Sequence, residues 1–151
     1  MDTDIIHKEL DLIQEVIRRM ASNSFEVKKW LIGILTAIVF FKHEELLGGN
    51  GQLLWLLFVP VLCFWYLDAF FLRSEKVYRE MYRWVVQNRT ATSDYLYDLN
   101  TMRRSHAGVE VNFTERAGSI WKAIFSSTLV PFYLVPIVFI AAFGIRSCLT
   151  C

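Results

Sequence analysis

Asp68 is the residue whose surroundings most need a chemical explanation. It is the one charged residue in the apolar run 53–72, and an ionised carboxylate in an apolar environment costs free energy unless a cation or hydrogen bonds compensate it. The expected partners are the basic residues near the same end of the apolar segments: Lys28, Lys29, Lys122, and Arg73 of a neighbouring subunit. The carboxylate therefore serves either as half of an ion pair that fixes helix register or as a charge that lines a conduction path or gate.

The residues that usually carry catalysis or bind metals are scattered along the chain. His7, His43 and His106 lie in different segments, and the sequence contains no H-E-x-x-H, Walker A or G-x-S-x-G motif. Cys148 and Cys151 form a single C-x-x-C. Because a structural zinc ion usually takes four ligands, a disulfide or an unstructured tail is the favoured interpretation. We therefore expect no enzyme activity, no cofactor and no bound metal.

Three apolar runs indicate an all-α integral membrane protein with three transmembrane helices. Residues 53–72 and 123–145 are 20 and 23 residues long, and about 20 residues of helix cross a bilayer core of roughly 30 Å. Residues 30–41 give only about 18 Å of helix. This run is therefore either a buried helix of a soluble protein or a span that extends past both of its ends, toward Leu47. We prefer the span, because the two longer runs require a bilayer.

Prolines interrupt the two longer runs. Pro60 lies in the middle of the second run and predicts a kink there, and Pro131 and Pro136 interrupt the third run. The hydroxyl side chains of residues 126–128 come just before Pro131 and could satisfy backbone carbonyls that the prolines leave free.

An amphipathic helix is expected before the first run. In residues 4–20 the apolar positions recur every three or four residues: Ile6, Leu10, Ile13, Ile17 and Met20. The polar positions lie opposite: Lys8, Glu9, Asp11, Glu15 and Arg18. Residues 21–24 are expected to break this helix, with Asn23 and Glu26 as a capping box that starts the next one.

A second amphipathic helix is expected to extend the second span into the cytoplasm. Past Leu72 an apolar stripe from Val77 to Val85 continues at helical spacing. Glu75 and Arg79 form an i,i+4 pair on the solvent-facing side of the same helix. This stripe is expected to bury the stripe of residues 4–20, or else one of the two helices lies flat on the membrane. Beyond it, residues 88–119 form either a small cytoplasmic subdomain or a segment that orders on ligand binding, and residues 108–113 alternate like a short strand.

Basic residues are distributed unevenly between the segments. Residues 1–29 hold five and residues 73–122 hold nine of the sixteen Lys and Arg residues. With three spans these segments share one side, and the positive-inside rule places them in the cytoplasm and the C-terminus outside. The same segments hold twelve of the fifteen Asp and Glu residues, so they do not form a strongly cationic surface.

The expected domain organisation follows from this topology. Residues 1–24 form the cytoplasmic amphipathic helix, and residues 25–72 form the first two spans. Residues 73–122 form the cytoplasmic helix and loop region, and residues 123–151 form the third span with a short external tail.

Three stretches carry a resemblance to a family of small bacterial membrane proteins: RMASNSFEVKKWLIGIL (19–35), FWYLDAFFLRSEKVYREMYRWV (64–85) and SIWKAIFSSTLVPFYL (119–134). They resemble the membrane effectors encoded beside nucleotidyltransferases in anti-phage systems of the Hailong type. The resemblance implies an oligomeric channel in the bacterial inner membrane, controlled by a nucleotide or oligonucleotide that the partner nucleotidyltransferase makes. Three spans of one subunit do not readily enclose an aqueous path, so a channel requires a ring of subunits, for which we expect a tetramer.

The implied ligand is anionic, and its expected contacts are six cytoplasmic arginines: Arg18, Arg19, Arg79, Arg83, Arg103 and Arg104. The competing hypothesis is a membrane anchor or scaffold that does not conduct ions and recruits a cytoplasmic partner through its amphipathic helices.

Overall fold

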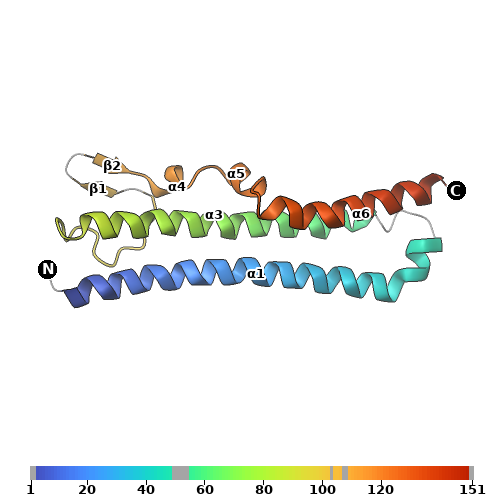
Figure 1. The fold of residues 1–151 in the computed structure, drawn as a ribbon, viewed down its shortest axis with the longest axis horizontal. Coiled ribbons are helices and arrows are strands. Elements are labelled where there is room, and N and C mark those ends of the chain that lie inside the picture. The colour runs from blue at the N-terminus through green and yellow to red at the C-terminus, as the bar shows by residue number, and fades with distance from the viewer. Residues whose placement is uncertain (1–2, 49–54, 103, 107–108, 150–151) are drawn as a thin grey trace.

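The structure is a computed structural model that describes residues 3–48, 55–102, 104–106 and 109–149. It is mostly helical. The elements in chain order are α1 (Thr3–Gly48), α3 (Phe58–Asn88), β1 (Arg104–His106), β2 (Val109–Val111), α4 (Phe113–Arg116), α5 (Ile120–Ile124) and α6 (Leu129–Leu149). Figure 1 shows a long rod in which α1 and α3 lie side by side. The hairpin β1–β2 and α4 cover α3 at one end, and α6 covers it at the other.

The expected break at residues 21–24 is wrong, because α1 is one continuous helix of 46 residues. Ile13, Val27 and Leu31 are all buried, and their spacing puts them on one helix face. Asn23, the predicted cap, lies inside α1 and begins no new helix. The hydroxyl of the next residue, Ser24, donates to the carboxylate of Asp68 on α3. A tertiary partner for the local polar residue, together with an apolar face that continues in phase, explains why the helix does not stop.

The apolar side chains of the rod form two separate clusters. At the α6 end, a cluster joins α1, α3 and α6 through Leu31, Val61 and Tyr133 among others. At the other end, Ile13 of α1 packs with Met81 and neighbouring residues of α3 and with the hairpin region. The prediction that the two amphipathic stripes bury each other is therefore confirmed. The polar face of α1 is only partly as predicted, because Glu9 is buried.

Two of the three prolines lie in the first turn of a helix. From Phe58 onward the second run and its extension form one helix, α3, so Pro60 lies in the first turn of this helix and not in its middle. Backbone N–H groups of a first turn lack helical partners in any case, so a proline costs little there. Pro131 is likewise in the first turn of α6, whereas Pro136 lies inside it.

The third run is two helices and not one. The short α5 ends at Ile124, and α6 starts at Leu129. Ser126 accepts hydrogen bonds from the backbone N–H of Leu129 at its side-chain oxygen, 3.3 Å, and at its carbonyl, 3.1 Å. Ser126 thus caps the start of α6. The use of the hydroxyls of residues 126–128 to satisfy free carbonyls stays a prediction.

Within the part of the chain that the structure describes, one helix is long and apolar enough to cross a membrane by length and composition, the stretch Leu129–Arg146 of α6. The first run is helical and its helix continues to Gly48, but α1 does not meet the same criteria of length and apolar composition. The second run lies partly in residues 49–54, outside the described ranges.

Residues 104–113 contain the short strand that the sequence predicted. Val109–Val111 pairs with Arg104–His106 in an antiparallel hairpin, in which Ser105 lies opposite Glu110. Asn112 then caps α4 by accepting from the backbone N–H of Thr114 at 3.1 Å. Residues 104–116 thus form a small folded unit against α3.

Candidate functional site

Asp68 lies at a junction of three helices. Its Oδ2 is 2.5 Å from Nζ of Lys28 on α1 and accepts a hydrogen bond of 3.0 Å from the hydroxyl of Tyr133 on α6. Its Oδ1 accepts from the hydroxyl of Ser24, one turn before Lys28. Lys28 also donates to the Ser24 hydroxyl oxygen at 2.9 Å. Of the partners expected from the sequence, Lys28 is the one that the structure brings to the carboxylate.

Asp68 is sealed from solvent inside one subunit. Its side chain is 0% exposed, and that of Lys28 is 20% exposed. Three donors from two neighbouring helices surround the carboxylate, which is the condition under which a buried charge is tolerated. The arrangement fits an ion pair that sets the register of α1, α3 and α6. A carboxylate that lines a path through a single subunit would instead face water.

Further contacts hold α5 and the preceding loop at the level of this junction. Trp65 stacks on Tyr133 with ring centroids 5.6 Å apart, and its indole N–H donates to the carbonyl of Ile124 at 3.1 Å. Arg73 donates from Nε to the carbonyl of Gly118 at 2.9 Å. Gly118 has φ of 85°, a left-handed conformation that favours glycine. The end of the rod that holds α5 and α6 with the adjoining parts of α1 and α3 is the apolar half, and the opposite end is the polar half. The junction therefore joins the helices of the apolar half to the loop that precedes α5.

Two of the predicted ligand-binding arginines meet in one groove. Arg18 of α1 and Arg79 of α3 line a groove of about 610 Å³ together with Asp11, Gln14 and Glu15. Arg79 is already engaged, with Nη2 2.5 Å from Oε1 of Glu75. The lining residues with Glu75 thus hold three carboxylates and two guanidiniums. A groove of this composition does not favour a polyanionic ligand.

The remaining predicted arginines do not converge on that groove. Arg83 pairs with Glu80 on the same helix at 2.6 Å, Arg19 is exposed on α1, and Arg103 lies outside the described residues. Arg104 is fully buried. Burial lowers the pKa of its guanidinium, an effect that the nearby carboxylates of Asp98 and Glu9 partly oppose.

A buried ion pair at the hairpin end was not foreseen from the sequence. Glu9 of α1 and Arg89 at the end of α3 are each 1% exposed, and the carboxylate accepts from both Nε and Nη2 of the guanidinium. Arg89 also donates from Nη1 to the carbonyl of Asp94 at 2.7 Å. The two residues are 80 positions apart, and both belong to polar types that usually lie at the surface, so no local pattern marks them as partners.

Among the described residues, no group of three or more His, Cys, Asp and Glu side chains could hold a metal ion. Cys63 is a free, exposed thiol on α3. The side chains of His43, His106 and Cys148, and the whole of Cys151, lie outside the described part of the structure.

Comparisons of this chain with protein-family models, curated proteins and solved structures found no match. The function proposed below therefore depends on the geometry of the two halves of the rod and on the resemblance carried by the sequence itself.

Proposed function

We propose that this chain is a three-span integral membrane protein of the bacterial inner membrane, and that copies of it assemble into an ion channel. The channel acts as an effector of anti-phage defence and responds to a nucleotide or oligonucleotide on its cytoplasmic side. The resemblance to effectors of the Hailong type supports the defence role and the class of ligand. The structure supports the proposal that the chain lies in a membrane.

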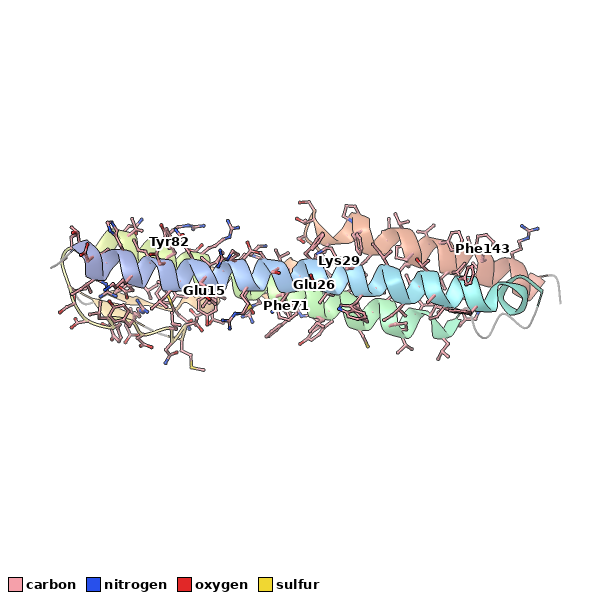
Figure 2. The ribbon with its side chains drawn as sticks, turned by 90° about the horizontal axis from the view of Figure 1, so that it is seen from below. Glu15, Glu26, Lys29, Phe71, Tyr82 and Phe143 are labelled. Carbon is pink, nitrogen blue, oxygen red and sulfur yellow. The ribbon has the colours of Figure 1, made fainter. Side chains whose placement is uncertain are left out.

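The observation that carries the proposal is the apolar outer surface of the α6 half of the rod. Residues 30–41, 55–67 and 123–145 contain no charged residue, and their helices pack against one another. Large apolar side chains are exposed on each helix of this half: Phe40, Phe41, Val59, Leu62, Val135 and Val138. Figure 2 shows the contrast, with carbon predominating around Phe143 and nitrogen and oxygen frequent around Glu15. Exposed apolar surface of this extent fits lipid, not water.

A belt of aromatic and basic residues marks the boundary between the two halves. Phe25, Trp30, Trp121 and Phe125 are each more than 60% exposed. Lys29, labelled on α1 in Figure 2, has its Nζ 5.2 Å from the ring of Phe25. Amphipathic rings and lysine ammonium groups concentrate at the headgroup level of membranes. The buried junction around Asp68 lies at this level, which supports an interfacial position where a charge costs less than at the bilayer centre.

The channel part of the proposal places the conduction path between subunits. In one subunit, packed side chains such as Leu31, Val61 and Ile140 form the described interior of the apolar half. We expect four copies to form a ring that encloses the conduction path between them. The two long helices α1 and α3 each continue from the polar half into the apolar half. Ligand binding in the polar half would therefore move the spans directly.

Reconstitution of the purified protein in liposomes tests this function. We expect ion flux that changes when a single-stranded oligonucleotide is added on the side of the polar half. An electrically silent bilayer at high protein density would contradict the channel and favour the non-conducting anchor, since the amphipathic polar half would then serve only to recruit a partner. The mass of the detergent-solubilised particle gives the number of subunits independently.

A further inference from the structure

Arg104, the first residue of β1, is held in a box of aromatic rings. The centre of its guanidinium lies 5.0 Å from the ring of Trp84, 5.5 Å from Phe113 and 5.7 Å from Tyr95. Its Nη2 donates to the carbonyl of Asp98, but its Nε and Nη1 are buried without any hydrogen-bond partner. Buried polar atoms in proteins are nearly always hydrogen-bonded. Two unpaired donors on one buried cation therefore point to an acceptor that binds there in another state of the protein.

The charge of Arg104 is also poorly balanced. Glu9 is the nearest buried carboxylate, but its two oxygens accept from Arg89. Among the described residues no carboxylate forms an ion pair with Arg104, although Asp98 is close enough to raise its pKa. Two buried guanidiniums thus share one buried carboxylate. An oxyanion beside Arg104 would balance the charge and fill its empty donor positions.

The loop over Arg104 is strained and is held by the arginines beneath it. Tyr95 and Tyr97 have φ of 59° and 58°, in the left-handed region that costs free energy for residues with a side chain. The carbonyls of Asp94 and Asp98 occupy donors of Arg89 and Arg104. These two hydrogen bonds hold the loop over Arg104, so a ligand reaches the buried, unpaired Nε and Nη1 only when the loop moves aside.

We propose that residues 92–98 form a lid over an oxyanion site, and that Arg104 binds a phosphate group through Nε and Nη1 when the lid opens. Figure 1 places the hairpin at the end of the rod opposite the C-terminal end of α6. The phosphate therefore belongs to a soluble ligand and not to a lipid headgroup. Tyr95 and Tyr97 are partly exposed and offer rings on which a base can stack. The inference rests on the proposed function for two statements, that the ligand is soluble and that it is a nucleotide.

The groove with Arg18 and Arg79 is the weaker candidate for the same ligand. Its carboxylates outnumber its guanidiniums once Glu75 is included, so phosphate would meet repulsion there. At the lid the buried guanidiniums of Arg89 and Arg104 face the single buried carboxylate of Glu9, and the carboxylates of Asp94 and Asp98 belong to the lid itself and are not buried.

Thermal unfolding of the full-length protein in detergent tests the lid site, with inorganic pyrophosphate as the probe and sodium chloride at equal ionic strength as the control. We expect pyrophosphate to raise the unfolding midpoint of the wild type by several degrees, with saturation, because a ligand that binds only the folded state stabilises it. Arg104→Met should abolish the rise. Arg83→Met, at an exposed arginine paired within α3, should retain it. A wild type that does not respond, or an Arg104→Met variant that still does, overturns the proposal.

Tyr95→Gly provides an independent test in case Arg104→Met does not fold. Glycine adopts φ of 59° without strain, and the substitution removes one ring of the lid. We expect the concentration of pyrophosphate at half-maximal effect to fall several-fold, because the closed lid competes with the ligand. An unchanged concentration overturns the lid.

Failure of this site and failure of the proposed function give different results. If pyrophosphate binding requires Arg104 but the liposomes stay electrically silent, the oxyanion site is supported and the channel is contradicted. If the oligonucleotide changes ion flux equally in the wild type and in Arg104→Met, the channel is supported and the oxyanion site is contradicted.

Discussion

Lys28 and Asp68 form an ion pair across the two longest helices of the molecule, with 2.5 Å between Nζ and Oδ2. Tyr133 of α6 donates to the same carboxylate oxygen at 3.0 Å. One buried acid thereby fixes the register of α1, α3 and α6 at the boundary between the polar and apolar halves. A shift of α1 or α3 along its axis would break this contact, so the two helices are expected to move together.

Asp68→Asn should destabilise the protein by about 3 kcal/mol, near the low end of the range for breaking a buried ion pair. Asparagine keeps the size but has one acceptor oxygen, and Ser24 and Tyr133 donate to different oxygens of Asp68, so one of these hydroxyls also loses its acceptor. Lys28 loses its counter-charge, but its 20% exposure lets it recover part of its hydration. The free energy of unfolding in detergent measures the effect.

Lys29→Gln is the matched control for that substitution. Lys29 pairs with Glu26 on the same helix, and both side chains are about half exposed. Pairs of this kind contribute roughly 0–1 kcal/mol. Equal losses in Asp68→Asn and Lys29→Gln would contradict a structural role for the buried pair.

Glu9→Gln should destabilise the polar half by about 3–5 kcal/mol, because it leaves the buried guanidinium of Arg89 without a counter-charge. The double variant Glu9→Gln, Arg89→Met should lose less than the sum of the two single variants, since it removes both charges. Additive losses in this cycle would show that Glu9 and Arg89 do not interact energetically.

Two glycines in helices should respond oppositely to alanine. At Gly144 of α6 a Cβ would lie 3.3 Å from the ring of Trp55, whereas at Gly33 of α1 it would meet no atom within 4 Å. Gly33→Ala should therefore be neutral or stabilising by up to about 1 kcal/mol, and Gly144→Ala should lower the unfolding midpoint. A large loss in Gly33→Ala would instead indicate that another subunit packs closely against that face of α1.

Arg104→Met should leave the stability nearly unchanged, within about 1 kcal/mol. Methionine has a similar length, and replacing a poorly paired buried charge with an apolar side chain is often neutral or favourable. The three aromatic contacts of the guanidinium are lost, which opposes this gain. Chemical unfolding monitored by tryptophan fluorescence gives the difference, and a loss as large as that of Glu9→Gln would contradict the prediction.

The sequence predicted the elements that depend on periodic burial. The stripes of residues 4–20 and 77–85 pack as expected, since helical spacing alone identifies a face that must be covered. It also included Lys28 among four possible partners of Asp68, because each lies near the point where an apolar run meets a charged segment. Both inferences need only local pattern and the cost of exposing or burying a group.

The sequence could not predict features that depend on distant partners. Asn23 and Glu26 match a helix start, yet α1 continues there, because Ser24 and the neighbouring apolar residues find partners on α3. The burial of Glu9, Arg89 and Arg104 likewise depends on the loop and hairpin that close over them. Local propensity is overruled in both places by contacts between segments far apart in the chain.

Labelling of single cysteines by a membrane-impermeant maleimide in intact bacterial spheroplasts tests the three-span topology most directly. One variant keeps Cys151 with Cys63 and Cys148 changed to serine, and a second carries Val86→Cys, at an exposed position of α3, with all native cysteines changed to serine. Three spans with a cytoplasmic polar half predict that Cys151 is labelled in intact spheroplasts and that residue 86 is labelled only after lysis. Labelling of residue 86 in intact spheroplasts, or protection of Cys151 until lysis, would contradict this topology.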